Sequence, residues 1–186
     1  MRLRRLVALL PLALTACGYN TLQTYDEKAN AAKQQIEVQL QRRADLVPNL
    51  VEVVRGQAKQ ELEVFTQVAK ARSGLVDAVQ KGDPRGMAEA NEQLTTAMRG
   101  LMIQVEAYPQ IKCDQAFLRL QDELTGTENR IAVSRTDLNG AVETYNTYIR
   151  KFPQVMTAKV LGSKPKEYFE VSNAAAREAP KIDLTK

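Results

Sequence analysis

This chain of 186 residues contains no histidine, no tryptophan and only two cysteines. Without histidine it cannot form the histidine-containing zinc or copper sites found in many enzymes, and it cannot activate a nucleophile through an imidazole. Carboxylate-bridged metal sites in helical bundles use Glu-x-x-His pairs, so these are not expected either. The nine glycines form no phosphate-binding loop, and no serine lies in a Gly-x-Ser-x-Gly elbow. We therefore expect no catalytic residue and no metal.

The amino-terminal segment has a basic start, a short apolar run and small residues before a cysteine. Three arginines lie among the first five residues, residues 6–14 are apolar, and Cys17 follows Leu-Thr-Ala. This order is typical of a secretory signal, and the apolar run is shorter than the ~20 residues that a bilayer-spanning helix needs. With cysteine directly after the small residues, the segment resembles a bacterial lipoprotein signal. The resemblance implies cleavage after Ala16 and lipid attachment to Cys17. The alternative is an ordinary signal peptide with Cys17 as a free thiol.

The charge of the chain is concentrated in this amino-terminal segment. The net charge is +4, but removal of residues 1–16 leaves 23 basic residues against 22 acidic ones. The remaining basic residues are scattered rather than gathered on one face, which makes a nucleic-acid partner unexpected.

Apolar and small residues recur at steps of three and four along most of the chain, and this spacing predicts amphipathic helices. No segment has the alternating pattern of a strand. The three predicted stripes are Ile36, Leu40, Ala44, Val47, Leu50, Val54, Ala58, Leu62, Phe65 and Ala69; Met87, Asn91, Leu94, Met98, Leu101, Val105 and Tyr108; and Phe117, Leu120, Leu124, Thr127, Ile131, Ser134, Leu138, Ala141, Tyr145, Tyr148 and Phe152.

Prolines and capping residues predict where these helices begin, bend and end. Pro48 removes one helical donor, but the first stripe continues in phase across it, so we expect a kink rather than a stop. Residues 81–84 form a stronger break, in which Asp83 and the proline after it are a good helix start. Asp114 can cap the third helix, and Phe152-Pro153 ends it.

These patterns predict an all-α fold: an elongated, antiparallel, up-and-down helical bundle with three long helices plus a shorter fourth element. The fourth helix is expected from residues 75–81, from the carboxyl segment, or from a helix split at Pro48. The predicted domains are a cleaved signal peptide over 1–16, a lipidated polar tether over 17–26, the bundle over 27–161, and a tail over 162–186 that docks on the bundle or extends from it.

Two polar segments lie near the stripes. Arg43, Asp45 and Asn49 surround the proline of the first helix, and Glu128 and Arg130 lie in the middle of the third. One hypothesis joins them into an acid/base or ligand site. We favour the other, a structural polar network that fixes helix register and satisfies groups freed at the proline, because paired charges in bundles are commonly structural.

The remaining candidates are a cysteine and several aromatic residues. Once Cys17 carries lipid, Cys113 is the only thiol, and we expect burial rather than an intermolecular bond. Phe152 is expected to plug the end of the bundle rather than to serve recognition. Tyr168 and Phe169 are expected to anchor the tail and are also candidates for binding a partner.

Several motifs together resemble the LemA family. They run in that family's order over almost all of the chain after the signal, and the resemblance implies a long four-helix bundle with no established catalytic residues. The amino-terminal lipid signal and Cys113 depart from its usual pattern. The motifs are residues 36–51 (IEVQLQRRADLVPNLV), Glu106-Ala107-Tyr108-Pro109, Thr127-Glu128-Asn129-Arg130-Ile131-Ala132, Tyr145-Asn146, Phe152-Pro153, Glu167-Tyr168-Phe169-Glu170 and Ala179-Pro180-Lys181-Ile182-Asp183.

These observations predict a non-enzymatic, lipid-anchored scaffold or interaction protein of a bacterial cell envelope. Its expected partners are the membrane, through the lipid on Cys17, and a protein of unknown identity; no cofactor beyond that covalent lipid is expected. Gly18 after the cysteine favours the outer membrane, facing the periplasm, and the alternative is the outer face of the cytoplasmic membrane. The alternative functions are an accessory subunit of a membrane protease or transporter and, less favoured, a carboxylate-based enzyme.

Overall fold

The computed structural model describes the backbone of residues 2–57 and 63–170, and within these ranges the side chains from residue 18 onward. Over this part of the chain it is all-α and contains no strand, which confirms the predicted fold class. The helices are α1 (Arg2–Gln57), α2 (Glu63–Lys81), α3 (Pro84–Val105), α4 (Pro109–Lys112), α5 (Gln115–Tyr148) and α6 (Gln154–Val160).

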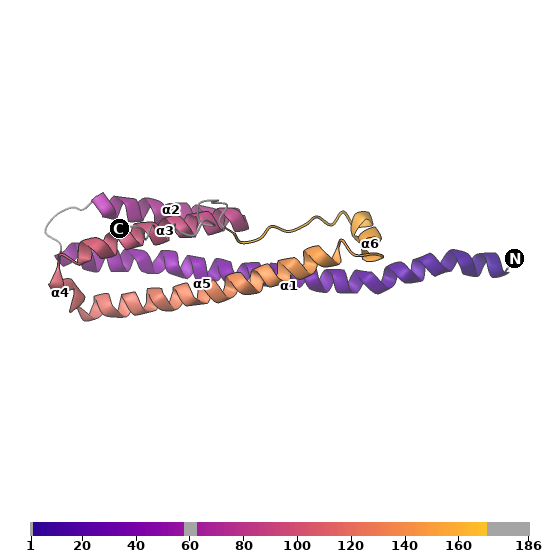
Figure 1. The fold of residues 1–186 in the computed structure, drawn as a ribbon, viewed down its shortest axis with the longest axis horizontal. Coiled ribbons are helices and arrows are strands. Elements are labelled where there is room, and N and C mark those ends of the chain that lie inside the picture. Colours follow the sequence, from indigo (N-terminus) through magenta and orange to yellow (C-terminus); the bar gives the residue numbers. More distant parts are fainter. Residues whose placement is uncertain (1, 58–62, 171–186) are drawn as a thin grey trace, which may run out of the picture.

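The molecule is a long rod in which α1 and α5 run antiparallel (Figure 1). The hairpin of α2 and α3 packs beside the carboxyl half of α1, so that four helices lie side by side there. In the other half, the described segments that accompany the α1–α5 pair are α6 and the extended segment after it. The first turns of α1 project beyond α6.

The helix starts follow from the predicted caps. The carboxylate of Asp83 accepts hydrogen bonds from the N–H groups of Arg85 and Gly86 at the start of α3. Asp114 accepts from those of Ala116 and Phe117 at the start of α5. These bonds satisfy donors that have no partner inside the helix.

The first predicted stripe belongs to two helices rather than one. Helix α1 continues through Pro48, as expected, but ends at Gln57, and α2 begins at Glu63. In the sequence, apolar and small residues continue at steps of three and four across the break, so periodicity does not reveal it. The buried face of α2 instead includes Val64 and Val68. The fourth helix of the bundle is therefore α2, which includes the predicted segment 75–81. Ala58 and Leu62 of the stripe lie outside the described residues.

The core follows the predicted stripes closely. Every member of the second stripe is buried or half-buried, and so are all members of the third except Phe152. Phe152 is 82% exposed, so the prediction that it plugs the bundle is wrong. It lies beyond the end of α5 at Tyr148 and no longer follows the phase of that helix. Ala69 is also exposed.

The predicted polar tether is a part of α1. Residues 18–26 are helical, and Leu22 is only 2% exposed, packed in a small cluster with Tyr145, Ile149 and Ala158. The tether prediction is thus wrong for these residues, because the single apolar side chain within the polar run meets an apolar cluster from α5 and α6. The predicted signal over 1–16 is not tested by this arrangement.

The segment after α6 runs back along α5 as an extended chain (Figure 1). The side chain of Asn146 accepts from the N–H of Lys166 and donates to its carbonyl, at 2.8 and 2.9 Å. Asn139 does the same with Phe169, at 2.8 and 3.3 Å. Seven helical residues and three extended ones each advance about 10 Å, so the two asparagines match the spacing of the two tail residues. Residues 171–186 of the predicted tail lie outside the described residues.

Among the residues that the structure describes, no helix has a stretch long and apolar enough to cross a membrane.

Candidate functional site

A polar cluster centred on Arg43 lies inside the four-helix half of the rod. The Arg43 side chain is 2% exposed, and its Nη1 donates to Asn91 Oδ1 at 2.6 Å and to Thr95 Oγ1 at 3.0 Å. Its Nη2 lies 2.6 Å from Glu128 Oε1. One guanidinium thus links α1, α3 and α5. Polar links of this kind are typical of groups that hold helices in register.

The electrostatics of this cluster are dominated by a buried guanidinium and a half-exposed carboxylate. Burial lowers the pKa of the Arg43 guanidinium from its usual value, and the carboxylates of Glu128 and Glu92 oppose that shift. Arg43 Nε is buried and has no hydrogen-bond partner. Glu128 is half-exposed and is the one carboxylate bonded to the guanidinium, so the cluster offers no pair of facing carboxylates for acid/base chemistry.

Asp45, Asn49 and Arg130 were predicted to belong to this network, but they lie outside it. All three are exposed, and Asp45 accepts a hydrogen bond from its helical neighbour Gln41. Two residues advance a helix by about 200°, so Asp45 faces away from the Arg43 side of α1. The same rotation turns Arg130 away from the Glu128 side of α5.

Asn91 and Thr95 were missed by sequence reasoning. Asn91 occupies a position of the second stripe that is otherwise apolar, and Thr95 lies one turn later on α3. An amide on a buried stripe requires a hydrogen-bonding partner. A polar residue on this otherwise apolar stripe therefore indicates a buried hydrogen-bonding partner, and this is the signal by which the sequence could reveal Asn91.

The backbone group freed at Pro48 is satisfied by a residue that the sequence did not suggest. Proline has no N–H, so the carbonyl four residues earlier, that of Ala44, lacks its helical donor. Arg72 of α2 donates from Nε to this carbonyl at 2.7 Å. The bond joins α2 to α1 at a point where the hydrogen-bond ladder of α1 lacks a donor.

A hollow between α2 and α3 is open to solvent and has a volume of about 1020 Å³. It carries charges of both signs, and no cluster of three or more metal-binding side chains occurs in the described part of the chain. Its lining residues are Gln67, Lys70, Ala71, Ser73, Gly74, Asp77, Glu89, Glu92, Gln93, Thr96 and Ala97.

The predicted burial of Cys113 is wrong, because its side chain is exposed. It follows α4 as that helix's cap, where the neighbouring Ile111 takes the buried position. Tyr168 is half-buried and Phe169 is 4% exposed in the bundle's own core. Phe169 therefore anchors the tail and is not presented to solvent. The side chain of Cys17 lies outside the described side chains.

Comparison with known proteins identifies the chain's relatives. Residues 32–184 match the LemA family. The chain belongs to the LemA family. This LemA-family chain is 32% identical to the magnetosome proteins MamQ 1 and MamQ 2 of Paramagnetospirillum magneticum (strain AMB-1), with 86% of the chain aligned to 67% of each relative. It is 30% identical to the magnetosome protein MamQ of Magnetospirillum gryphiswaldense (strain MSR-1), with 81% of the chain aligned to 64% of that protein.

Proposed function

We propose that this LemA-family protein is a non-enzymatic scaffold of a bacterial cell envelope, anchored by lipid on Cys17. The observation that carries the proposal is the continuity of α1 from Cys17, the expected first residue of the processed chain, into the core of the rod. Gly18, the next residue, accepts a hydrogen bond from Tyr148 of α5 at 3.1 Å. A lipid on Cys17 would thus hold the folded rod itself rather than a loose tether.

The polar side chains that the structure describes support a scaffold role more than a catalytic one. The guanidinium of Arg43 is hydrogen-bonded to side chains of two other helices, α3 and α5, and these bonds include only one carboxylate. The names of the relatives give a compartment, the magnetosome, and no reaction. A scaffold needs a stiff body and an exposed surface. The open hollow between α2 and α3 is the candidate surface for a protein partner.

Membrane attachment is tested by fractionating cells that express the full chain or its Cys17→Ser variant, with radiolabelled palmitate in the medium. We expect label and membrane partition for the wild-type chain and loss of label for Cys17→Ser. Cys113→Ser is the matched control, since it removes the other cysteine and should keep both. Equal labelling of Cys17→Ser and wild type would refute lipid attachment at this residue.

The scaffold role is tested by photo-crosslinking in intact cells from Gln67 and Gln93, which line the hollow on α2 and α3. We expect one discrete protein adduct from these two positions and none from Val133, which is 62% exposed on α5. Adducts of the same kind and yield from all three positions would contradict a specific surface at the hollow.

A further inference from the structure

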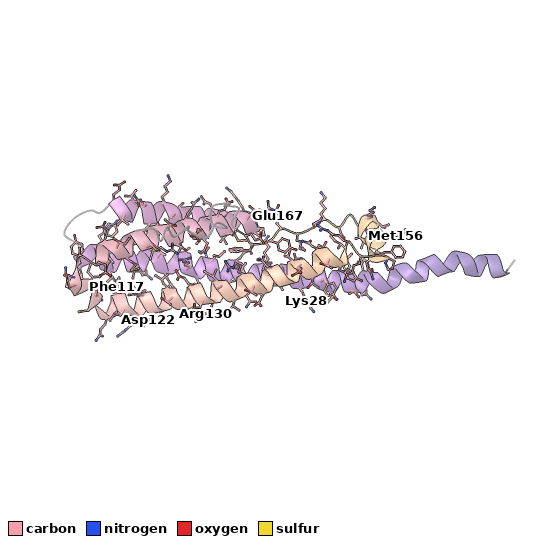
Figure 2. The ribbon with its side chains drawn as sticks, in the orientation of Figure 1. Lys28, Phe117, Asp122, Arg130, Met156 and Glu167 are labelled. Carbon is pink, nitrogen blue, oxygen red and sulfur yellow. The ribbon has the colours of Figure 1, made fainter. Side chains whose placement is uncertain are left out.

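Exposed apolar side chains gather at one end of the rod, on and beside α6. Phe152 is 82% exposed, Met156 60% and Val160 87%. Met156 and Val160 are four residues apart and so share one face of α6, while Ala158 on the opposite face is 3% exposed, packed against Leu22 of α1 and residues of α5. Helix α6 therefore buries one face in the bundle and presents its apolar face to the surroundings. Figure 2 shows Met156 at this end of the molecule.

The same end is basic. The sequence has no acidic residue from 144 to 166, and it has Arg150, Lys151, Lys159 and Lys164 at exposed positions in that stretch. The neighbouring turns of α1, residues 18–25, carry no charge. The first carboxylate beyond them, that of Asp26, is paired with Lys166 at 3.1 Å. Basic residues therefore outnumber acidic ones in the described part of this end.

This surface lies beside the residue that follows the anchoring cysteine. A methyl group added at Gly18 would lie 3.7 Å from Gln154 Cγ and 3.9 Å from Thr157 Oγ1, both on α6. Cys17 directly precedes Gly18 in α1, and one step along the helix axis is about 1.5 Å. Whatever surface holds Cys17 must therefore lie close to α6.

We propose that α6 and the turn before it form a second membrane contact, in which Phe152, Met156 and Val160 enter the interfacial region of the bilayer and the flanking lysines and arginine bind anionic lipid headgroups. Exposed apolar side chains rimmed by basic ones are the pattern of interfacial membrane binding. This α6 surface rests on the proposed function, because it uses the lipid on Cys17 to bring the bilayer to it. Two contacts at one end would fix the rod's orientation, with the far end standing away from the membrane.

The length of the rod allows one end to be distinguished from the other by its distance from the membrane. Gln57, the last residue of α1, donates to Asp114 Oδ2 at 2.8 Å, so Cys113 lies near the far end of α1. From Gly18 to Gln57 the helix rises about 60 Å. A probe on Cys113 should therefore remain far from the lipid, while one at residue 160 should reach it.

The test places an environment-sensitive fluorophore on the full, processed chain in vesicles of phosphatidylethanolamine with phosphatidylglycerol as the anionic lipid, some acyl chains carrying a quencher. The label is placed at Val160→Cys or Met156→Cys in a Cys113→Ser background. The controls are Val133→Cys on α5, where the valine is about as exposed (62%) as Met156 (60%), and native Cys113. We expect a blue-shifted emission and at least threefold stronger quenching at 156 and 160 than at either control. Reversing charge with Lys151→Glu and Lys159→Glu should reduce that quenching at least twofold, and Arg130→Glu with Arg135→Glu on α5 should not.

The possible outcomes distinguish failure of the α6 contact from failure of the lipid anchor on Cys17. Protein that floats with the vesicles but shows equal, weak quenching at 160 and 133 overturns the α6 contact and leaves the anchor standing. Strong quenching at 160 in a Cys17→Ser variant, where residue 160 carries the only thiol, supports the α6 contact independently of the anchor. A blue shift at 160 without vesicles that grows with protein concentration assigns the surface to a second copy of the chain and overturns the proposal. Protein that does not float at all contradicts both.

Discussion

The bond between Arg72 and the carbonyl of Ala44 leads to a prediction with a built-in control. Pro48 leaves that carbonyl without a helical donor, and Arg72 Nε supplies one from α2 at 2.7 Å. Arg72→Met keeps the apolar part of the side chain and removes the donor. A buried carbonyl left unsatisfied costs about 1–3 kcal/mol, and because Arg72 is half-buried water can partly replace it. We expect a loss of about 1–2 kcal/mol in the free energy of unfolding.

Pro48→Ala should remove the need for this bond. Alanine restores an N–H at position 48, which can donate to Ala44 within the helix. In the Pro48→Ala background, Arg72→Met should therefore cost less than ~0.5 kcal/mol, which gives a coupling energy near 1 kcal/mol between two residues 24 positions apart in sequence. Arg130→Met, an exposed arginine on α5, is the matched control and should stay within about 0.5 kcal/mol of wild type.

The measurement is equilibrium urea unfolding followed by circular dichroism, with all variants in a Cys17→Ser background that prevents lipid attachment. With a slope of roughly 2 kcal/mol per molar urea, the midpoint should fall by about 0.5–1 M for Arg72→Met. An equal cost of Arg72→Met with and without the Pro48→Ala substitution would refute the assignment of this bond to the proline.

Three further predictions follow from the packing and the caps. Glu128→Ala should cost about 1–2 kcal/mol in urea unfolding, because it leaves the buried Arg43 guanidinium without its ion partner while Glu128 itself is half-exposed; a cost below that of an ordinary surface change would contradict it. Gly82 has φ +67°, so Gly82→Ala should lower the free energy of unfolding by about 1 kcal/mol. Gly140 lies in mid-helix with nothing within 4 Å of an added methyl group, so Gly140→Ala should raise it by about 0.5–1 kcal/mol. Shifts of the melting temperature in the same direction for both variants would count against the assigned backbone conformations. The hydrogen bonds of Asp114 to two backbone N–H groups at the start of α5 lower the pKa of its carboxyl. Its contribution is therefore present above the unfolded value of about 3.9 and is lost as the pH falls through the lower folded pKa. Asp114→Asn should flatten the acid limb of a melting-temperature profile, and an unchanged limb would argue against this cap.

The helices themselves could be predicted from the sequence because their stripes are regular and their caps are strong. Asp83 and Asp114 both begin helices as expected, and nearly every stripe residue is buried. The break between α1 and α2 could not be predicted, because apolar and small residues continue at steps of three and four across it in the sequence. Helicity before residue 27 was missed because one apolar residue, Leu22, is too weak a periodic signal on its own.

The polar contacts were only partly predictable. A charged residue such as Arg43 near a stripe indicates a network, but its partners depend on which helices pack against it. Arg72 lies 28 residues from Ala44, and nothing local links them. Cys113 was misjudged because exposure at a helix junction depends on which neighbour, here Ile111, takes the core position.

Lipid attachment at Cys17 is tested most directly by mass spectrometry of the amino-terminal peptide of the protein isolated from its native membranes. We expect a peptide that begins at Cys17 and carries a diacylglycerol thioether with an acylated amino group. A peptide that begins at Met1, or a mature chain whose cysteine is unmodified, would contradict it.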